Sequence, residues 1–169
     1  SRLSGKDFCD CDWKGVCIYN EFIQNGKKGC GIRSEQEMPI VQRSVYGEET
    51  TVLVLDCGRG FALKCLRPGS FLFLKKPEDN HFYNMPVSVL AADPEKWLVH
   101  LAVRAFAAKS KHVLEEEEKL TVRGVYSNGI LGIKKLLGTR GRIEPSRRIM
   151  IITKGLGFAP AALLTSWIG

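Results

Sequence analysis

Short apolar segments with a two-residue period, each followed within a few residues by a turn signal, are the feature that most limits the fold of this 169-residue chain. Alternation of apolar and polar residues is typical of strands that bury one face. Glycine, proline, asparagine and aspartate between the segments supply the turns. The predicted strands span residues 51–55, 70–74, 87–90, 97–103 and 120–123. Five or six strands so close together imply a small antiparallel barrel or sandwich, because only closure or stacking covers that many strand edges.

Residues 109–118 interrupt the strand pattern with a run of good helix formers. Ser110, near the start of this run, is a candidate cap, and the acidic residues 115–118 fit the solvent-facing side of a helix. We therefore predict one helix inserted between two strands.

After the last predicted strand the pattern changes to that of a different fold class. Residues 148–153 form a mostly apolar run, residues 154–160 a turn with two glycines, and residues 161–168 an apolar helical pattern. A buried strand, a glycine turn and a helix make the opening unit of a doubly wound nucleotide-binding domain. Gly155 and Gly157 would let a pyrophosphate approach the amides at the start of that helix.

The composition is that of a globular protein with a basic balance, since 44% of residues are hydrophobic, 25% are charged and the formal net charge is +7. Much of the positive charge lies in residues 134–148, where glycine and proline indicate a solvated connector, with a partner-docking surface as the alternative. Aromatic residues stand at core-spaced strand positions and do not alternate with basic residues, which argues against a nucleic-acid partner. No apolar run approaches the ~20 residues of a membrane-spanning helix, so no membrane association is expected.

Four of the six cysteines fall in the first thirty residues, a segment with little apolar material for a core. Four thiolates match a tetrahedral zinc ion or an iron–sulfur centre, and a metal would add folding energy that this segment lacks. Because the spacing fits no standard framework, a disulfide and unligated thiols stay open as alternatives. The candidate metal ligands are Cys9, Cys11, Cys17 and Cys30. Cys57 and Cys65 are interpreted as small buried hydrophobes in strand-like surroundings.

Four stretches, in their order and spacing, resemble a known family. They are residues 68–74, beginning Pro-Gly-Ser-Phe; residues 85–89, Met-Pro-Val-Ser-Val; residues 123–129, Arg-Gly-Val-Tyr-Ser-Asn-Gly; and residues 152–160, ending Gly-Phe-Ala-Pro. They are similar to the Pro-Gly-Gln-Phe strand, the flavin-contacting Arg-Pro-Ile-Ser strand, the Gly-Pro-Leu-Gly-Asn-Gly turn and the Gly-Gly-Ile-Gly-x-Ala-Pro turn of the ferredoxin–NADP reductase superfamily. Within it, residues 38–169 resemble the electron-transfer subunit of dihydroorotate dehydrogenase and the sulfide dehydrogenase-like FAD/NAD-binding proteins.

This resemblance implies a mainly β fold, in which a six-stranded antiparallel Greek-key barrel of the flavin-binding type carries one helix and is followed by the first β-α unit of a nucleotide-binding domain. The implied parts are a cysteine-bearing segment at 1–37, the barrel at 38–133, a basic connector at 134–147 and the start of the NAD(P)-binding domain at 148–169. The implied cofactor is FAD, with FMN as an alternative, and the implied partner is a redox protein in the cytoplasm. Because the nucleotide-binding domain would be cut short, we expect NAD(P) to bind only to a longer form of the chain.

The resemblance also assigns candidate cofactor-binding residues. Pro86, Val87 and Ser88 would contact the flavin ring, Ala108, Lys109 and Ser110 would contact its diphosphate, and Gly129, Gly155 and Gly157 complete the set. Met85 stands where the family has an arginine, and a thioether cannot supply a charge-assisted contact to a phosphate. Arg104, Lys109 and Arg123 are the candidate replacements, while Lys154 takes the place of the first glycine of the nucleotide turn.

Two functions are consistent with these patterns. The first is a flavin-dependent electron-transfer component that passes electrons between NAD(P)H and an iron–sulfur or protein acceptor. The alternative is a non-catalytic barrel without flavin that binds a redox partner protein through its cysteine segment and basic surface. Neither needs a nucleophile or general acid, and the scattered positions of His81, His100 and His112 indicate structural roles.

Overall fold

The computed structural model describes residues 35–79, 85–127, 130, 133 and 148–168. The chain divides into two compact units, Ser1–Ser34 and Glu35–Gly169, and every described residue belongs to the second. The candidate metal ligands Cys9, Cys11, Cys17 and Cys30, the candidate residue Gly129, and His81 lie outside the described residues. The domain boundaries inferred from the sequence stay a prediction.

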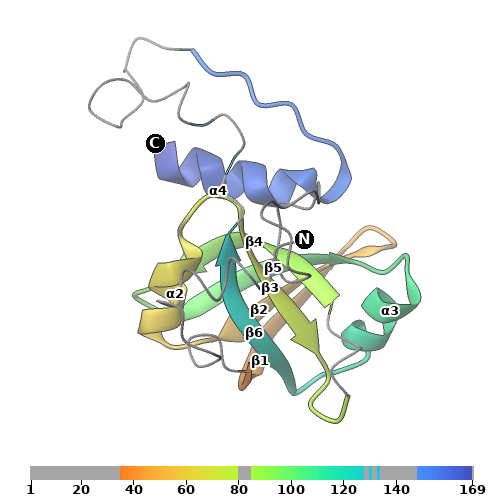
Figure 1. Cartoon of the computed structure of the whole chain (residues 1–169). Helices are drawn as coiled ribbons and strands as arrows, with labels where there is room; N and C mark the ends of the chain where they lie inside the picture. The colour runs from red at the N-terminus through yellow and green to blue at the C-terminus, as the bar shows by residue number, and fades with distance from the viewer. Residues whose placement is uncertain (1–34, 80–84, 128–129, 131–132, 134–147, 169) are drawn as a thin grey trace, which may run out of the picture. The chain divides into compact units, whose positions relative to one another are not determined.

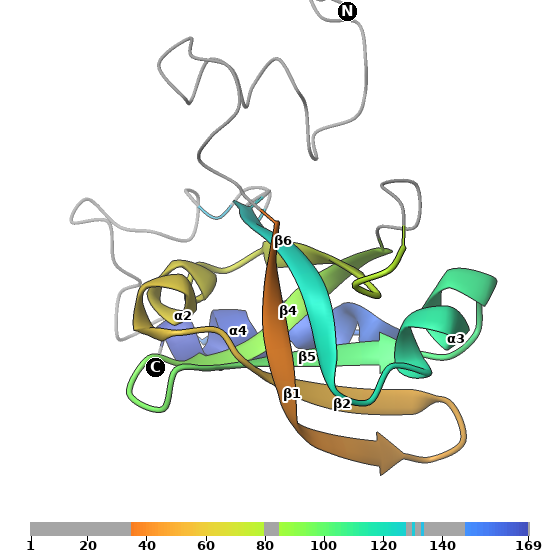
Figure 2. The same ribbon diagram turned by 90° about the horizontal axis from the view of Figure 1, so that it is seen from below.

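Six antiparallel strands close into a barrel in the order β1-β2-β5-β4-β3-β6, which Figures 1 and 2 show in two perpendicular views. Strand β2 pairs with β5 and β3 pairs with β6, so strands distant in sequence become neighbours in a Greek-key arrangement. The predicted six-stranded antiparallel Greek-key barrel is therefore confirmed. The strands are β1 (Glu35–Tyr46), β2 (Thr50–Asp56), β3 (Ser70–Lys75), β4 (Met85–Asp93), β5 (Leu98–Arg104) and β6 (Lys119–Ser127).

Strand β1 is the strand for which the sequence pattern gave no clear signal. Only Met38 of its twelve residues is buried, because much of the strand faces solvent. Its first half pairs with β6 and its second half with β2, and the register shifts between Ile40 and Gln42 where the strand changes partner. A strand that closes a barrel by bending from one neighbour to another has no need of a continuous apolar face.

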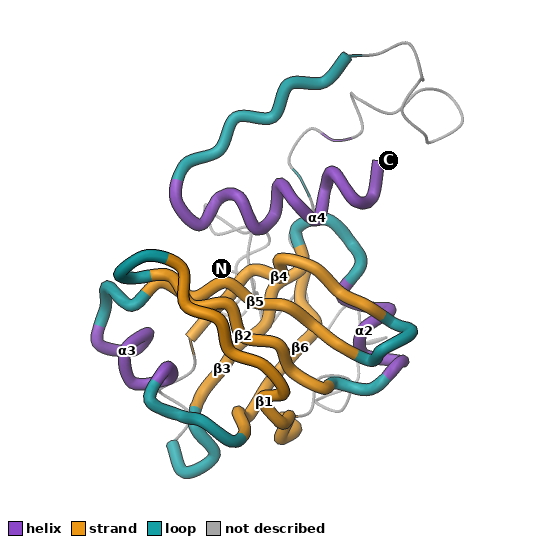
Figure 3. Tube along the Cα trace, turned by 180° about the vertical axis from the view of Figure 1, so that it is seen from behind, coloured by secondary structure: helices purple, strands orange, loops and turns teal. Residues whose placement is uncertain are grey.

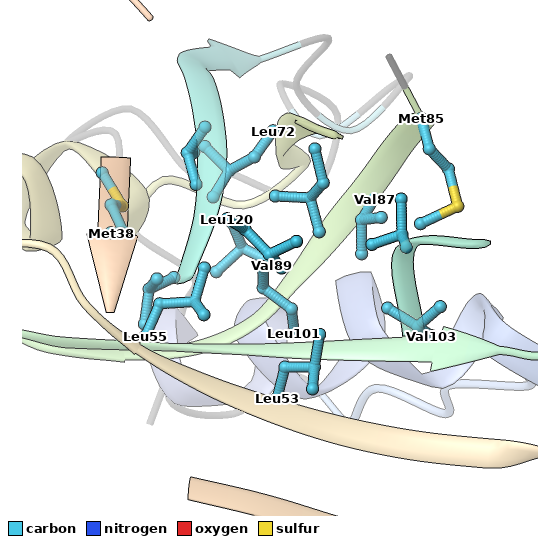
Figure 4. Packing of buried hydrophobic residues seen from close by; sticks show 14 of the residues in the cluster. Met38, Leu53, Leu55, Leu72, Met85, Val87, Val89, Leu101, Val103 and Leu120 are labelled. Atoms are coloured by element: carbon cyan, nitrogen blue, oxygen red, sulfur yellow. The ribbon is translucent and has the colours of Figure 1, made fainter. Parts of the chain in front are cut away.

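The barrel interior is a dry core made by the inward-facing residues of all six strands, as Figure 4 shows. Alternate residues of each strand point inward, which is the consequence of the two-residue period of a pleated strand. The residues with no exposed surface include Leu53, Leu55, Leu72, Leu74, Val89, Val99, Leu101, Leu120 and Val122.

A short helix that the sequence analysis missed, α2 (Arg59–Cys65), follows β2. Gly58 precedes it with a φ of 71°, a value that favours glycine. Phe61, Ala62 and Cys65 are its buried residues, so Cys65 belongs to a helix and its assignment to strand-like surroundings was wrong. The spacing i, i+1, i+4 of these three residues is a helical signal, which the strong strand pattern on both sides obscured.

Helix α3 (Ala108–Leu114) lies on the opposite side of the barrel from α2 and is shorter than the predicted helix at 109–118. The acidic residues after Leu114 leave the helix because β6 begins at Lys119, whose pairing with Pro39 helps to close the barrel. The amide of Ile40 donates to the carbonyl of Glu118 at 2.8 Å, and this hydrogen bond also holds the segment between α3 and β6 in place. Barrel closure here overrides the helix propensity of the glutamates.

The loop after β3 is anchored to α3 through Asp79 and His112. The Nε2 atom of His112 lies 2.8 and 3.0 Å from the two carboxylate oxygens of Asp79. The amide of Lys76 donates to the same carboxylate at 3.1 Å, and the ammonium of Lys75 donates to the Asp79 carbonyl at 3.2 Å. Burial alone would raise the pKa of Asp79, but the hydrogen bonds from His112 and Lys76 hold it below its ordinary value.

The C-terminal segment differs in part from the expected strand, turn and helix. Helix α4 (Phe158–Ile168) forms, follows the 3-10 turn η4 (Gly155–Gly157), and packs against β4 with Ala159, Leu163 and Leu164 buried (Figures 1 and 3). Residues 148–153, however, form no strand, because no described segment runs beside them to complete a ladder. Met150 and Ile152 are accordingly 84% and 85% exposed. None of the helices in the described part has the length and apolar content needed to cross a bilayer.

We expect Leu101→Ala to lower the free energy of unfolding by about 2–5 kcal/mol, because truncation of a fully buried leucine loses apolar contact and leaves a cavity. Leu101 has no exposed surface, whereas Leu63 on α2 is 50% exposed. Leu63→Ala is therefore the matched control, with an expected change within about 0.5 kcal/mol. Urea unfolding followed by circular dichroism measures both, and equal effects of the two substitutions would contradict the assigned core.

The lowered pKa of Asp79 predicts that its carboxylate stabilises the fold at neutral pH and that this contribution is lost in acid. A carboxyl group whose folded-state pKa is lowered stabilises the fold above its unfolded pKa, and this contribution is lost as the pH falls through the folded pKa. We expect Asp79→Asn to destabilise the protein at neutral pH, and the difference from wild type to shrink toward about pH 3. Urea unfolding at a series of pH values tests this. Glu78→Gln, the same charge change at an exposed neighbour, serves as control.

Candidate functional site

A cavity of about 370 Å³ opens where β4 begins and β5 ends. The two strands are antiparallel neighbours, so the first residues of β4 lie beside the last residues of β5, and the chain continues from β5 directly into α3. The turn η4 and the start of α4 form the remaining wall. The lining residues are Met85, Pro86, Val87 and Ser88 from β4; Ala102, Val103 and Arg104 from β5; Phe106, Ala107, Lys109 and Ser110 at and before α3; and Leu156 and Ala159 from the C-terminal segment.

Five of the candidate cofactor-binding residues line this one cavity. Pro86, Val87 and Ser88 come from β4, and Lys109 and Ser110 come from α3, more than twenty positions later in the sequence. Barrel closure is what brings the two groups together.

The other described candidates lie nearby but do not line this cavity. Ala108 is the first residue of α3, next to Lys109, and Gly157 ends η4. Gly155 lines a second cavity of about 540 Å³, whose walls include Tyr46, Glu49 and Phe158. The two cavities share Arg104 and Leu156, so they meet at the glycine turn.

The floor of the first cavity is apolar and its rim carries cations. Met85, Val87, Ala102 and Val103 are all less than 10% exposed, so Met85, for which the sequence resemblance led us to expect an arginine, is part of the floor. Arg104 and Lys109 are exposed at the rim.

The three basic residues considered as replacements for that arginine are separated by the structure. Arg104 lines the cavity, and its Nε and Nη2 atoms lie 2.6 and 2.5 Å from the carboxylate of Glu49. Arg123 does not line the cavity. Its guanidinium carbon instead lies 5.1 Å from the ring centroid of Phe73 on β3. The geometry therefore leaves Arg104 and Lys109 as the cations of the cavity.

Ser110 lines the cavity, but its hydroxyl already has backbone partners. It accepts from the amide of Ala107 at 3.1 Å and donates to the carbonyl of the same residue at 2.9 Å. The N-cap position belongs to Ala107, so the expectation that Ser110 caps the helix is corrected: it is the third helical residue and reaches back to the cap. Its hydroxyl holds the start of α3 in place.

The lining also includes residues that the sequence analysis did not assign to the site, among them Ala102, Val103, Phe106, Leu156 and Ala159. Ala102 and Val103 read as ordinary strand residues, and Leu156 and Ala159 are far along the chain. Phe106 carried the strongest available signal, since it is an aromatic residue in a turn between a strand and a helix. Within the part of the chain that the structure describes, no group of three or more metal-ligating side chains comes together.

Comparison with protein-family models and with curated proteins finds no match. Eleven chains of solved structures match. One of them belongs to the structure of an NADH-dependent reduced ferredoxin-NADP oxidoreductase, described for flavin-based electron bifurcation, with 20% identity and a TM-score of 0.42 over 58% of this chain and 34% of that chain. This chain thus spans about a third of that protein's length. A likeness at this level carries no argument about ligand or activity.

Cys57 lies between β2 and α2, and its thiol donates to the carbonyl of Trp97 at 3.2 Å. Burial, and then the neighbouring Asp56 carboxylate, raise the pKa of Cys57 to about 11. Burial also raises the pKa of Cys65, which has no exposed surface. Since the thiolate is the reactive form, we expect both thiols to react slowly at neutral pH.

We expect iodoacetamide at neutral pH to leave Cys57 and Cys65 unmodified in the folded protein and to modify both after denaturation in urea. Peptide mapping by mass spectrometry separates these two sites from the N-terminal cysteines. Rapid alkylation of Cys57 in the native protein would contradict its assignment as a structural thiol.

Proposed function

We propose that this chain is the flavin-binding barrel of an electron-transfer oxidoreductase, with FAD as the cofactor and FMN as the alternative. The observation that carries the proposal is the cavity of about 370 Å³ lined by Pro86, Val87, Ser88, Lys109 and Ser110, which come from two separate segments. A concave site of this size, mostly apolar and with a few polar groups, is typical of a small-molecule or cofactor site.

The floor of the cavity suits the flat apolar part of a flavin ring. Val87, Ala102 and Val103 are almost fully buried and have no polar side-chain atoms. A ring placed on them would exchange contact with water for apolar contact, which is favourable. Ser88, on the same strand as Val87 and half-buried, adds a hydroxyl that can donate to or accept from the polar edge of the ring.

The rim supplies the charge that a phosphate requires. Lys109 and Arg104 line the same cavity as Ser88; Arg104 is the last residue of β5, and Lys109 is the second residue of α3. An ammonium or guanidinium group makes a charge-assisted hydrogen bond to phosphate, and such bonds are stronger than neutral ones. Lys109 and Arg104 would then supply the phosphate contact that an arginine supplies in the resembled family, where this chain has Met85.

A bound flavin supplies the electron-transfer chemistry itself, and the protein binds, orients and shields it. The lining residues fit that division, because they provide an apolar floor, two serine hydroxyls and two cations but no paired nucleophile and base. We propose that electrons pass between NAD(P)H and an iron–sulfur or protein acceptor. Gly155, which lines the adjoining cavity, is proposed to face the nicotinamide nucleotide.

The second candidate function, a barrel that binds a redox partner protein without flavin, is favoured by Met85. A buried methionine in the floor provides no phosphate contact of its own. The two functions differ in one measurable property, which is whether the folded protein takes up flavin.

We expect Lys109→Glu to weaken the binding of FMN and FAD by about tenfold or more, because a charge-assisted hydrogen bond contributes about 1.5–3 kcal/mol. Lys111→Glu is the matched control, since Lys111 is exposed on the same helix and does not line the cavity. Riboflavin has no phosphate, so its affinity should be the same in both variants. Flavin fluorescence titration measures all three ligands.

Wild-type protein that binds none of the three flavins would overturn the proposed function and favour the partner-binding alternative. Equal losses of FMN affinity in Lys109→Glu and Lys111→Glu would instead point to a general effect of net charge.

A further inference from the structure

Phe106 is an aromatic side chain that is 70% exposed and yet lines the apolar cavity. It lies between the end of β5 and the start of α3, on the rim side of the floor formed by Val87 and Ala102. Single exposed aromatic residues are common on protein surfaces and need no explanation by themselves. Phe106, however, lies at the mouth of a cavity whose floor is apolar and almost fully buried. This position makes it a candidate ligand contact.

The backbone around Phe106 is held on both sides. The amide of Ala105 donates to the carbonyl of Glu49 at 2.7 Å, and the amide of Phe106 donates to the carbonyl of Arg104 at 3.0 Å. One residue later, Ala107 exchanges two hydrogen bonds with the hydroxyl of Ser110. The ring is therefore placed at the cavity mouth by a fixed backbone while much of its surface is left without protein contacts.

We propose that Phe106 packs its ring against the ring of the flavin, so that the flavin ring lies between Phe106 and the floor formed by Val87 and Ala102. This inference rests on the proposed function and adds the side chain that covers the bound ring. Offset or edge-to-face contact between aromatic rings adds binding energy beyond the area that it buries. Because the backbone already holds Phe106 in place, little order has to be created when the ligand binds.

The position of Phe106 in the chain also fits a ring contact and not a phosphate contact. It lies between Arg104 and Lys109, the two cations of the rim, and all three side chains line the same cavity. One short segment would then hold both ends of the ligand, with the aromatic side chain on the ring and the two cations on the phosphate. Loss of the aromatic ring should therefore affect every flavin, whether or not it carries a phosphate.

The test uses riboflavin, which isolates the ring from the phosphate, and measures its dissociation constant by fluorescence titration. We expect Phe106→Ala to bind riboflavin about tenfold more weakly, as befits the loss of an aromatic stacking contact. Phe106→Leu, which keeps apolar bulk without a ring, should recover only part of the loss, and Phe106→Tyr should bind like wild type. Trp167→Ala removes an aromatic residue that is 45% exposed on α4 and lines neither cavity, so its affinity should be unchanged.

Each outcome either supports or overturns the inference. Riboflavin binding by wild type with an unchanged affinity in Phe106→Ala overturns the role of Phe106 and leaves the proposed function standing. Full recovery in Phe106→Leu overturns ring stacking, because apolar bulk alone would then suffice. Failure of wild type to bind any flavin overturns the proposed function itself. Circular dichroism of Phe106→Ala checks the fold, which an exposed side chain should not disturb.

Discussion

The pairing of β3 with β6 is the contact on which the rest of this structure depends, because it closes the barrel between strands that are some fifty residues apart. On the outer face of this pair the rings of Phe71 and Tyr126 stack with centroids 5.5 Å apart, which adds cross-strand energy to the ladder. On the inner side, a Cβ on Gly124 would lie 2.7 Å from the Cδ2 atom of Leu72, so a larger residue there would require the Leu72 side chain to shift.

Closure also determines where a ligand can bind. Once β2, β5, β4 and β3 are locked in order, the beginning of β4 has to lie beside the end of β5, and α3 has to start at the same place. The interior of the barrel is filled by leucine and valine side chains, so the cavity forms at the end of these two strands, where the packing stops. Helix α4 packs on β4, and Leu156 in η4 and Ala159 in α4 form the opposite wall of the cavity. Met85 and Val87 of β4 thus belong both to the barrel core and to the cavity lining.

The sequence predicted the strands that have a clear local pattern of apolar and polar residues. It did not predict the features that depend on which segments lie side by side in the folded chain. Alternation identified the strands around Leu53, Leu72 and Leu101 because each buries one face in the core. It predicted no strand at β1, which is mostly exposed, and it failed at residues 148–153, because no segment that the structure describes runs beside this apolar run to pair with it. The cavity residues Val87 and Lys109 were assigned through family resemblance, whereas Phe106 was not, since its exposure and its place at the cavity mouth follow only from the closed barrel.

The ion pair between Arg104 and Glu49 determines how Arg104 is available at the cavity. Both side chains are about half exposed, and an ion pair between exposed groups contributes little, typically about 0–1 kcal/mol. A phosphate can therefore replace the Glu49 carboxylate as the partner of Arg104 at small cost, and it offers a bidentate acceptor in return. The buried Met85 side chain removes any need to desolvate a charge in the floor. The cavity thus has apolar side chains in its floor and charged side chains at its rim.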